Sequence, residues 1–71
     1  MKVNYVDDRG EKHMFLIDDS QVAGIDFHTN DEDGKKVKFL LASGETLTLY
    51  LGFVNNEPWE QLRDYFRERL I

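Results

Sequence analysis

Apolar and polar residues alternate along Lys35–Phe53, and this pattern predicts a β-hairpin with one continuous apolar face. The segment Ala42–Gly44 fits a three-residue loop whose last position is left-handed, where glycine costs least. The cross-strand pairs implied by this loop are Leu41 with Glu45, Phe39 with Leu47 and Val37 with Leu49. A two-residue turn would slip the register by one residue and place polar side chains opposite apolar ones, so the pattern selects the longer loop.

The same loop chemistry occurs twice more. Asp8–Gly10 predicts a hairpin that places Tyr5 opposite His13 and Val3 opposite Phe15. Glu32–Gly34 predicts a further hairpin whose pairs are Thr29 with Val37, Phe27 with Phe39 and Ile25 with Leu41. These pairs fall on the apolar face already chosen for Lys35–Phe53, and the agreement of two turns on one face supports the register. Gly24 indicates a bulge or bend in the strand that contains it.

The C-terminal segment predicts one helix. Asn55–Pro58 carries a capping residue followed by proline in the first turn, where its missing N–H costs little. The apolar residues that recur at helical spacing are Trp59, Leu62, Phe66 and Leu70. Such a helix is about 20 Å long and a seven-residue strand about 23 Å, so one helix covers one face of a sheet.

The predicted fold is therefore α+β with two layers: a five-stranded antiparallel meander, order 1-2-3-4-5, and one C-terminal α-helix packed across one face. We expect one domain over residues 1–71, with strands at about 2–7, 12–18, 22–29, 35–42 and 45–53 and a helix at about 57–70. The first and fifth strands are the predicted edges. The predicted core consists of Ile25, Phe27, Val37, Phe39, Leu41, Leu47, Leu49, Leu51, Trp59, Leu62 and Phe66.

Composition narrows the class of protein. The chain has 71 residues, no cysteine and a formal net charge of −5, with the acidic excess in residues 1–34. The lack of cysteine excludes disulfides and thiolate metal sites, and the acidic balance argues against direct nucleic-acid or anionic-membrane binding. No signal peptide or membrane-length apolar stretch is apparent, so we expect a cytoplasmic protein.

The sheet face away from the predicted helix is a candidate partner surface. The apolar residues expected there are Met14, Leu16, Leu40 and Tyr50. Contiguous exposed apolar area on a small protein suggests a homodimer or another protein partner. Two alternatives stay open: a scattered, solvated face, or a curved sheet that buries these residues.

A cluster of acids is the second candidate. In a meander the first and third loops lie at the same end of the sheet, about 10 Å apart. Their acids are Asp7, Asp8, Glu11, Asp31, Glu32 and Asp33. Such a cluster can imitate the phosphates of a nucleic acid and occupy a basic groove of a partner. The alternative is that these are ordinary turn residues that keep a small domain soluble.

Catalysis has little support in the sequence. The two histidines, His13 and His28, lie on different predicted strands, and Ser20 and Ser43 lie in turns with no base at a recognisable spacing. A calcium loop over Thr29–Leu40 fails because the first carboxylate and the bidentate Glu are missing. We therefore expect no enzyme activity, no catalytic or metal-binding residues and no cofactor.

Two functional hypotheses remain. The first is a non-enzymatic protein-interaction module that associates with itself through the open sheet face or the fifth-strand edge. The second is an acidic inhibitor that mimics nucleic acid. A meander with one helix resembles many short bacterial and phage proteins in shape, and this likeness implies no function.

Overall fold

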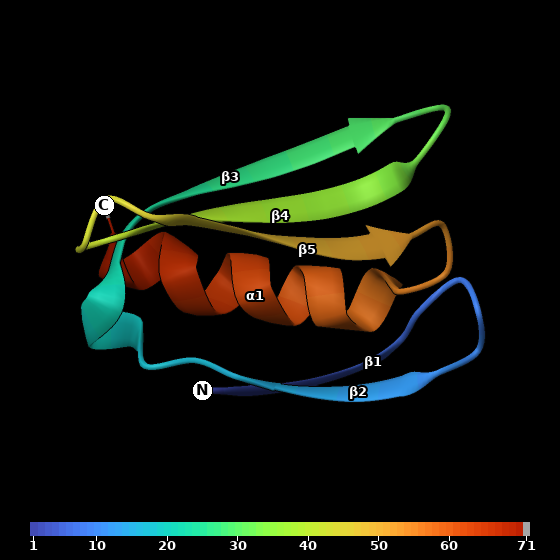
Figure 1. Cartoon of the computed structure of the whole chain (residues 1–71), viewed down its shortest axis with the longest axis horizontal. Coiled ribbons are helices and arrows are strands. Elements are labelled where there is room, and N and C mark those ends of the chain that lie inside the picture. Colours follow the sequence, from blue (N-terminus) through green and yellow to red (C-terminus); the bar gives the residue numbers. More distant parts are fainter. Residues whose placement is uncertain (71) are drawn as a thin grey trace.

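A computed structural model describes residues 1–70. The first elements are β1 (Lys2–Val6), β2 (Lys12–Leu16) and the short 3-10 helix η1 (Asp19–Gln21). They are followed by β3 (Val22–Asn30), β4 (Gly34–Leu41), β5 (Thr46–Gly52) and α1 (Asn56–Arg69). In Figure 1, α1 lies between the β3–β4–β5 sheet and the β1–β2 hairpin.

The five antiparallel strands form two sheets, one with the order β1–β2 and the other with the order β3–β4–β5. The prediction of an α+β fold with five antiparallel strands and a C-terminal helix is confirmed. The prediction of one continuous sheet is wrong at the junction of β2 and β3, which do not pair in the part of the chain that the structure describes. Side chains join the hairpin to the three-stranded sheet instead, and the ring of Phe15 stacks on that of Phe39.

The connection between β2 and β3 is bonded to α1. The Asp18 carboxylate accepts hydrogen bonds from the Ser20 N–H at 3.1 Å and from the Ser20 hydroxyl at 2.7 Å, which closes η1. The Asp19 carboxylate accepts a 2.7 Å bond from the Tyr65 hydroxyl and lies 3.2 Å from Arg69 Nε. Between β2 and β3, where the predicted meander has a hairpin, the chain instead forms a short helical turn that is hydrogen-bonded to α1.

Two of the three predicted registers are confirmed. The β1–β2 and β4–β5 pairs have the expected partners, and Gly10 and Gly44 have φ values of 81° and 93°. The β3–β4 pair is shifted by two residues, so Phe27 lies opposite Val37 rather than opposite Phe39. A shift of two residues leaves every side chain on its predicted face. The register irregularity between Val22 and Gly24 agrees with the predicted bulge.

Asn30 causes the shift in the β3–β4 pair. Its side-chain oxygen accepts hydrogen bonds from the N–H groups of Glu32 at 2.9 Å and Asp33 at 2.6 Å, which closes the turn over residues 31–33. Gly34 therefore opens β4, opposite Asn30, instead of ending the loop. Its φ is 77°, and a Cβ there would lie 2.5 Å from the carbonyl of Gly52, so glycine allows the two strands to approach closely at this point.

Phe39 lies at the centre of the core. It is fully buried, and its ring contacts Phe15 of the hairpin and Phe66 of α1 at centroid distances of 5.6 and 6.0 Å. The buried apolar residues among residues 1–70 are Val3, Val22, Val37, Phe39, Leu49, Leu51, Leu62 and Phe66. The prediction missed Val3 and Val22. It placed in the core five residues that remain partly or largely exposed, namely Ile25, Phe27, Leu41, Leu47 and Trp59.

Asn55 joins three segments at the start of α1. It occupies the N-cap position, as expected, but its side chain makes no capping bond. Its Nδ2 donates to the carbonyl oxygens of Val6 and Leu51, both at 2.6 Å, and its Oδ1 accepts from the Val6 N–H at 3.3 Å. The buried amide therefore ties β1 to the connection between β5 and α1.

Candidate functional site

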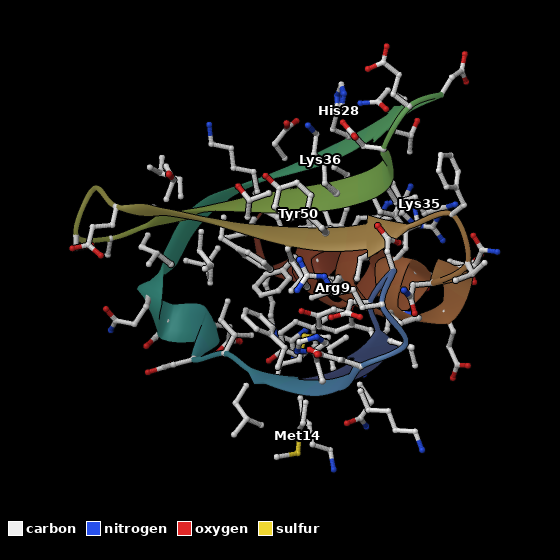
Figure 2. All side chains as sticks on the ribbon, turned by 45° about the vertical axis from the view of Figure 1, so that its right-hand side comes forward. Arg9, Met14, His28, Lys35, Lys36 and Tyr50 are labelled. Atoms are coloured by element: carbon white, nitrogen blue, oxygen red, sulfur yellow. The ribbon has the colours of Figure 1, made fainter. Side chains whose placement is uncertain are left out.

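The outer face of the β3–β4–β5 sheet is mainly polar. Its cross-strand rows are His28, Lys36 and Tyr50, and beside them Asp26, Lys38 and Thr48. These six side chains line a shallow hollow of about 310 Å³. Figure 2 shows His28, Lys36 and Tyr50 together on the upper side of the molecule. The middle strand of this face is basic, although the chain as a whole is acidic.

The four apolar residues predicted to form one partner surface lie on two separate sheets. Leu40 and Tyr50 are 46% and 61% exposed on the three-stranded sheet. Met14 and Leu16 are 60% and 64% exposed on the hairpin. Figure 2 shows Met14 on the lower side of the molecule and Tyr50 above it. The missing β2–β3 pairing is the reason, since it separates the two outer faces.

The missing β2–β3 pairing also leaves open an edge of β3, a strand predicted to lie in the interior of the sheet. Among the strands of residues 1–70, the nine-residue β3 pairs only with β4, so its other edge is open. The predicted edge strand β1 lies beside α1, where Gln61 Nε2 donates to the Lys2 carbonyl at 3.1 Å. The alternation along β3 fits a central strand and an edge strand equally well, so the sequence carried no signal for this edge.

A groove of about 440 Å³ runs along β3 on its inner face, between the strand and α1. Its apolar wall includes Ile25, Phe27, Phe66 and Leu70, and Arg63 and Arg67 also line it. Trp59 packs edge-on against Phe27, with centroids 5.2 Å apart, and holds that ring in place. The edge of β3 therefore combines open backbone with partly exposed apolar side chains.

A second groove, of about 540 Å³, lies between the hairpin and the first turn of α1. Tyr5 and His13 line it from the hairpin, and Asn55, Glu57 and Pro58 line it from the other side. The exposed residues Met14 and Val54 also contribute to its wall. The groove mixes polar and apolar groups, and no single ligand chemistry follows from its lining.

The β1–β2 and β3–β4 loops lie at the same end of the molecule, on the right in Figure 1. Both approach the end of β5, because a Cβ on Gly52 would lie 2.7 Å from Asp8 Oδ1 and a Cβ on Gly34 would meet the Gly52 backbone. The predicted acids therefore share one end of the fold. Basic groups lie there as well, and Lys36 Nζ is 4.0 Å from the Asp33 carboxylate.

Asp7 is engaged within its own loop. Its Oδ1 accepts hydrogen bonds from the N–H groups of Arg9 and Glu11, both at 2.9 Å, and its Oδ2 lies 2.7 Å from His13 Nε2. The His13 hydrogen bond, followed by that of the Glu11 N–H, lowers the pKa of the Asp7 carboxyl. The Tyr5 ring stacks on His13 at 4.8 Å, and partial burial together with the Asp7 charge raises the pKa of Tyr5.

The ligand atoms of Asp7, Glu11 and His13 lie within 4.8 Å of one another, a spacing at which three side chains can hold a divalent cation. Both Asp7 oxygens already accept hydrogen bonds, so a cation there would have to displace the His13 contact. The His13–Asp7 contact therefore acts as a hydrogen bond that closes the first hairpin.

The two candidate serines are engaged in their own turns. The Ser20 hydroxyl donates to the Asp18 carboxylate, and the Ser43 hydroxyl oxygen accepts from the Glu45 N–H.

The chain matches no known protein family, and no curated protein and no solved structure is significantly similar to it. Within residues 1–70, no helix is both long and apolar enough to cross a membrane. The geometry of the sheets and their edges therefore carries the functional argument alone.

Proposed function

We propose that this protein is a non-enzymatic interaction module that associates with itself through an exposed part of its three-stranded sheet. The observation that carries this proposal is the incomplete cover of that sheet. The helix and the hairpin lie on one face, the other face exposes Leu40 and Tyr50, and within residues 1–70 the outer edges of β3 and β5 have no partner strand. Open strand edges are ready sites of pairing with another chain.

Charge favours an edge over the face as the contact. Lys36 and Lys38 project from β4 at the centre of the outer face. If two copies stacked these faces over each other, the lysines of both middle strands would meet, and like charges in a contact are unfavourable. A contact along a strand edge satisfies backbone groups and keeps the lysines in water.

Light scattering after size exclusion, run over a wide range of protein concentration at low and high salt, tests the proposal. We expect a dimer whose population rises with concentration and persists at high salt, because backbone pairing and apolar contact are weakly screened. A monomer under every condition would exclude self-association.

The second candidate function is the acidic inhibitor that mimics nucleic acid. It is supported by the common end shared by the loops that carry Asp7, Asp8, Glu11, Asp31, Glu32 and Asp33. It is weakened by the bonds of Asp7 to His13 and by Lys36 beside Asp33. A partner complex that dissociates steeply with salt and is lost in the double variant Asp31→Asn/Asp33→Asn would favour this function over the first.

A further inference from the structure

We propose that two copies of this chain pair through the open edges of β3, antiparallel about a two-fold axis at Phe27. This inference rests on the proposed self-association and specifies its surface and register. The two three-stranded sheets then join into one continuous sheet, in which the β3 strands of the two copies are neighbours. Such strand addition is a common mode of recognition, because the main chain supplies the bonds and alternate side chains supply the register.

The open edge of β3 is only weakly protected against pairing with another strand. The strand is nine residues long and contains neither lysine nor proline, which commonly block pairing at exposed edges. Its bulge is confined to the beginning, between Val22 and Gly24. At β5, by comparison, Asp8 of the first hairpin approaches Gly52. The regular stretch of β3 runs from Ile25 to Asn30, whereas the regular pairing of β5 with β4 ends at Tyr50, so β3 offers the longer regular edge.

Charge selects β3 among the open edges. Asp26 and His28 are both exposed and project from the same face of the strand. With Phe27 opposite its own copy, Asp26 lies opposite His28 of the second copy, and the two-fold axis generates this pair twice. An imidazole N–H can donate to the carboxylate in each pair. β2 and β5 contain no acidic residue, so neither edge offers such a pair to a second copy of itself.

Neighbouring registers are less favourable. A shift that places Asp26 on the axis sets two carboxylates opposite each other, and like charges directly opposite destabilise a strand pair. A shift that places His28 on the axis leaves Asp26 opposite Asn30. An axis that lies between two residues changes the register by one residue and places polar side chains of one copy on the apolar face of the other. The axis at Phe27 is thus the register in which the Asp26 carboxylate and the His28 imidazole each find a hydrogen-bonding partner opposite.

The inner face adds apolar contact to the same pairing. Ile25 and Phe27 are only half-buried, and Leu70 is 40% exposed, all along the 440 Å³ groove beside β3. Pairing about Phe27 brings the two Phe27 rings together and places Ile25 opposite Thr29 of the second copy. Arg63 at the groove is hydrogen-bonded to Asp64 at 3.2 Å, which offsets its charge. Pairing therefore buries apolar side chains that remain partly exposed in the monomer.

A charge-swap series tests the surface and the register together. In Asp26→His, two histidines face each other, and in His28→Asp, two carboxylates do. We expect each single variant to raise the dimer Kd by about tenfold or more, because the two-fold axis counts each lost pair twice. The double variant Asp26→His/His28→Asp restores opposite partners and should return the Kd to within a few-fold of the original. Circular dichroism should show an unchanged fold, since both side chains are exposed.

Glu45→His, at an exposed carboxylate in the turn between β4 and β5, serves as the matched control and should leave the Kd unchanged. Slower hydrogen exchange of β3 amides at high protein concentration is the independent readout expected of strand pairing. A dimer that tolerates both single variants, or that the double variant fails to restore, overturns the β3 pairing while self-association stands. A wild-type chain that stays monomeric removes self-association and the β3 pairing together.

Discussion

The ring of Phe15 stacks on that of Phe39, with centroids 5.6 Å apart and the ring planes 28° from parallel. Phe15 belongs to the hairpin and Phe39 to the middle strand of the other sheet, so this contact joins two sheets between which the strands do not pair in residues 1–70. The hairpin is therefore held chiefly by side-chain packing. Its attachment should be more sensitive to a lost ring than to a lost surface group.

Phe15→Ala should destabilise the fold by about 2–3 kcal/mol, somewhat less than for a fully buried phenylalanine, because Phe15 is half-buried. Met14→Ala is the matched control, since Met14 is the neighbouring residue and is 60% exposed on the opposite face. It should change stability by about 0.5 kcal/mol or less. Urea unfolding measures both variants, and equal losses would contradict the inward role of Phe15.

Asn55→Ala removes the amide that bonds the backbone of Val6 and of Leu51. We expect a loss of about 1–3 kcal/mol, because the buried backbone groups are left without partners. The adjacent Asn56→Ala, at an exposed position, should cost far less. Thermal unfolding measures the loss, and hydrogen exchange of the Val6 amide should accelerate in Asn55→Ala alone. Unchanged exchange there would argue that Asn55 does not hold β1.

Gly34→Ala and Gly44→Ala separate backbone strain from close approach. Both glycines have positive φ, at 77° and 93°, so both substitutions carry a conformational cost of about 1–2 kcal/mol. A Cβ at Gly34 would also lie 2.5 Å from the Gly52 carbonyl, whereas one at Gly44 meets nothing within 4 Å. Gly34→Ala should therefore be clearly the more destabilising change in urea unfolding. Similar losses in the two variants would show that β4 moves freely away from Gly52.

Acid should weaken the bond between η1 and α1. The Tyr65 hydrogen bond is the main cause that lowers the pKa of the Asp19 carboxyl, and Arg69 contributes further. A carboxyl whose pKa is lowered in the folded state contributes its full stabilisation at pH values above the ordinary aspartate pKa of about 4. This contribution is lost as the pH falls through the lower pKa of the folded state. Asp19→Asn should therefore lose less stability than the wild type as the pH is lowered from about 4. Urea midpoints across this range measure the difference, and parallel curves would contradict the prediction.

Alkali should act on the same bond from the tyrosine side. The Asp19 hydrogen bond is the main cause that raises the pKa of the Tyr65 hydroxyl. Because the pKa of Tyr65 is raised in the folded state, its hydrogen bond contributes fully to stability below the ordinary tyrosine pKa of about 10. This contribution is lost as the pH rises through the higher pKa of the folded state. Tyr65→Phe should flatten this alkaline loss of stability. Tyr50→Phe, at an exposed tyrosine, is the matched control and should retain it.

The strands, their faces and most turns could be predicted from the sequence because the signals are local. Side chains alternate with a period of two, and the loops that end in Gly10 and Gly44 set their registers within a few residues. The β3–β4 register was missed because the Asn30 side chain closes its turn early, a bond that the glycine pattern alone does not reveal. The two candidate sites also differ in how well the sequence placed them. The acidic loops lie at one end of the molecule, as predicted, whereas the four apolar residues lie on two sheets and not on one face.

The local sequence pattern is enough to specify five antiparallel strands and a C-terminal helix, and to specify which side chains of each strand share a face. The packing of distant segments sets where the sheet is interrupted and hence which strand edges are open. Tyr65 and Asp19 lie 46 positions apart in the chain, and their hydrogen bond holds η1 against α1 at the point where the predicted β2–β3 pairing is absent. Periodicity acts between neighbours along the chain, whereas the exposure of the β3 edge depends on contacts that form only when distant segments pack.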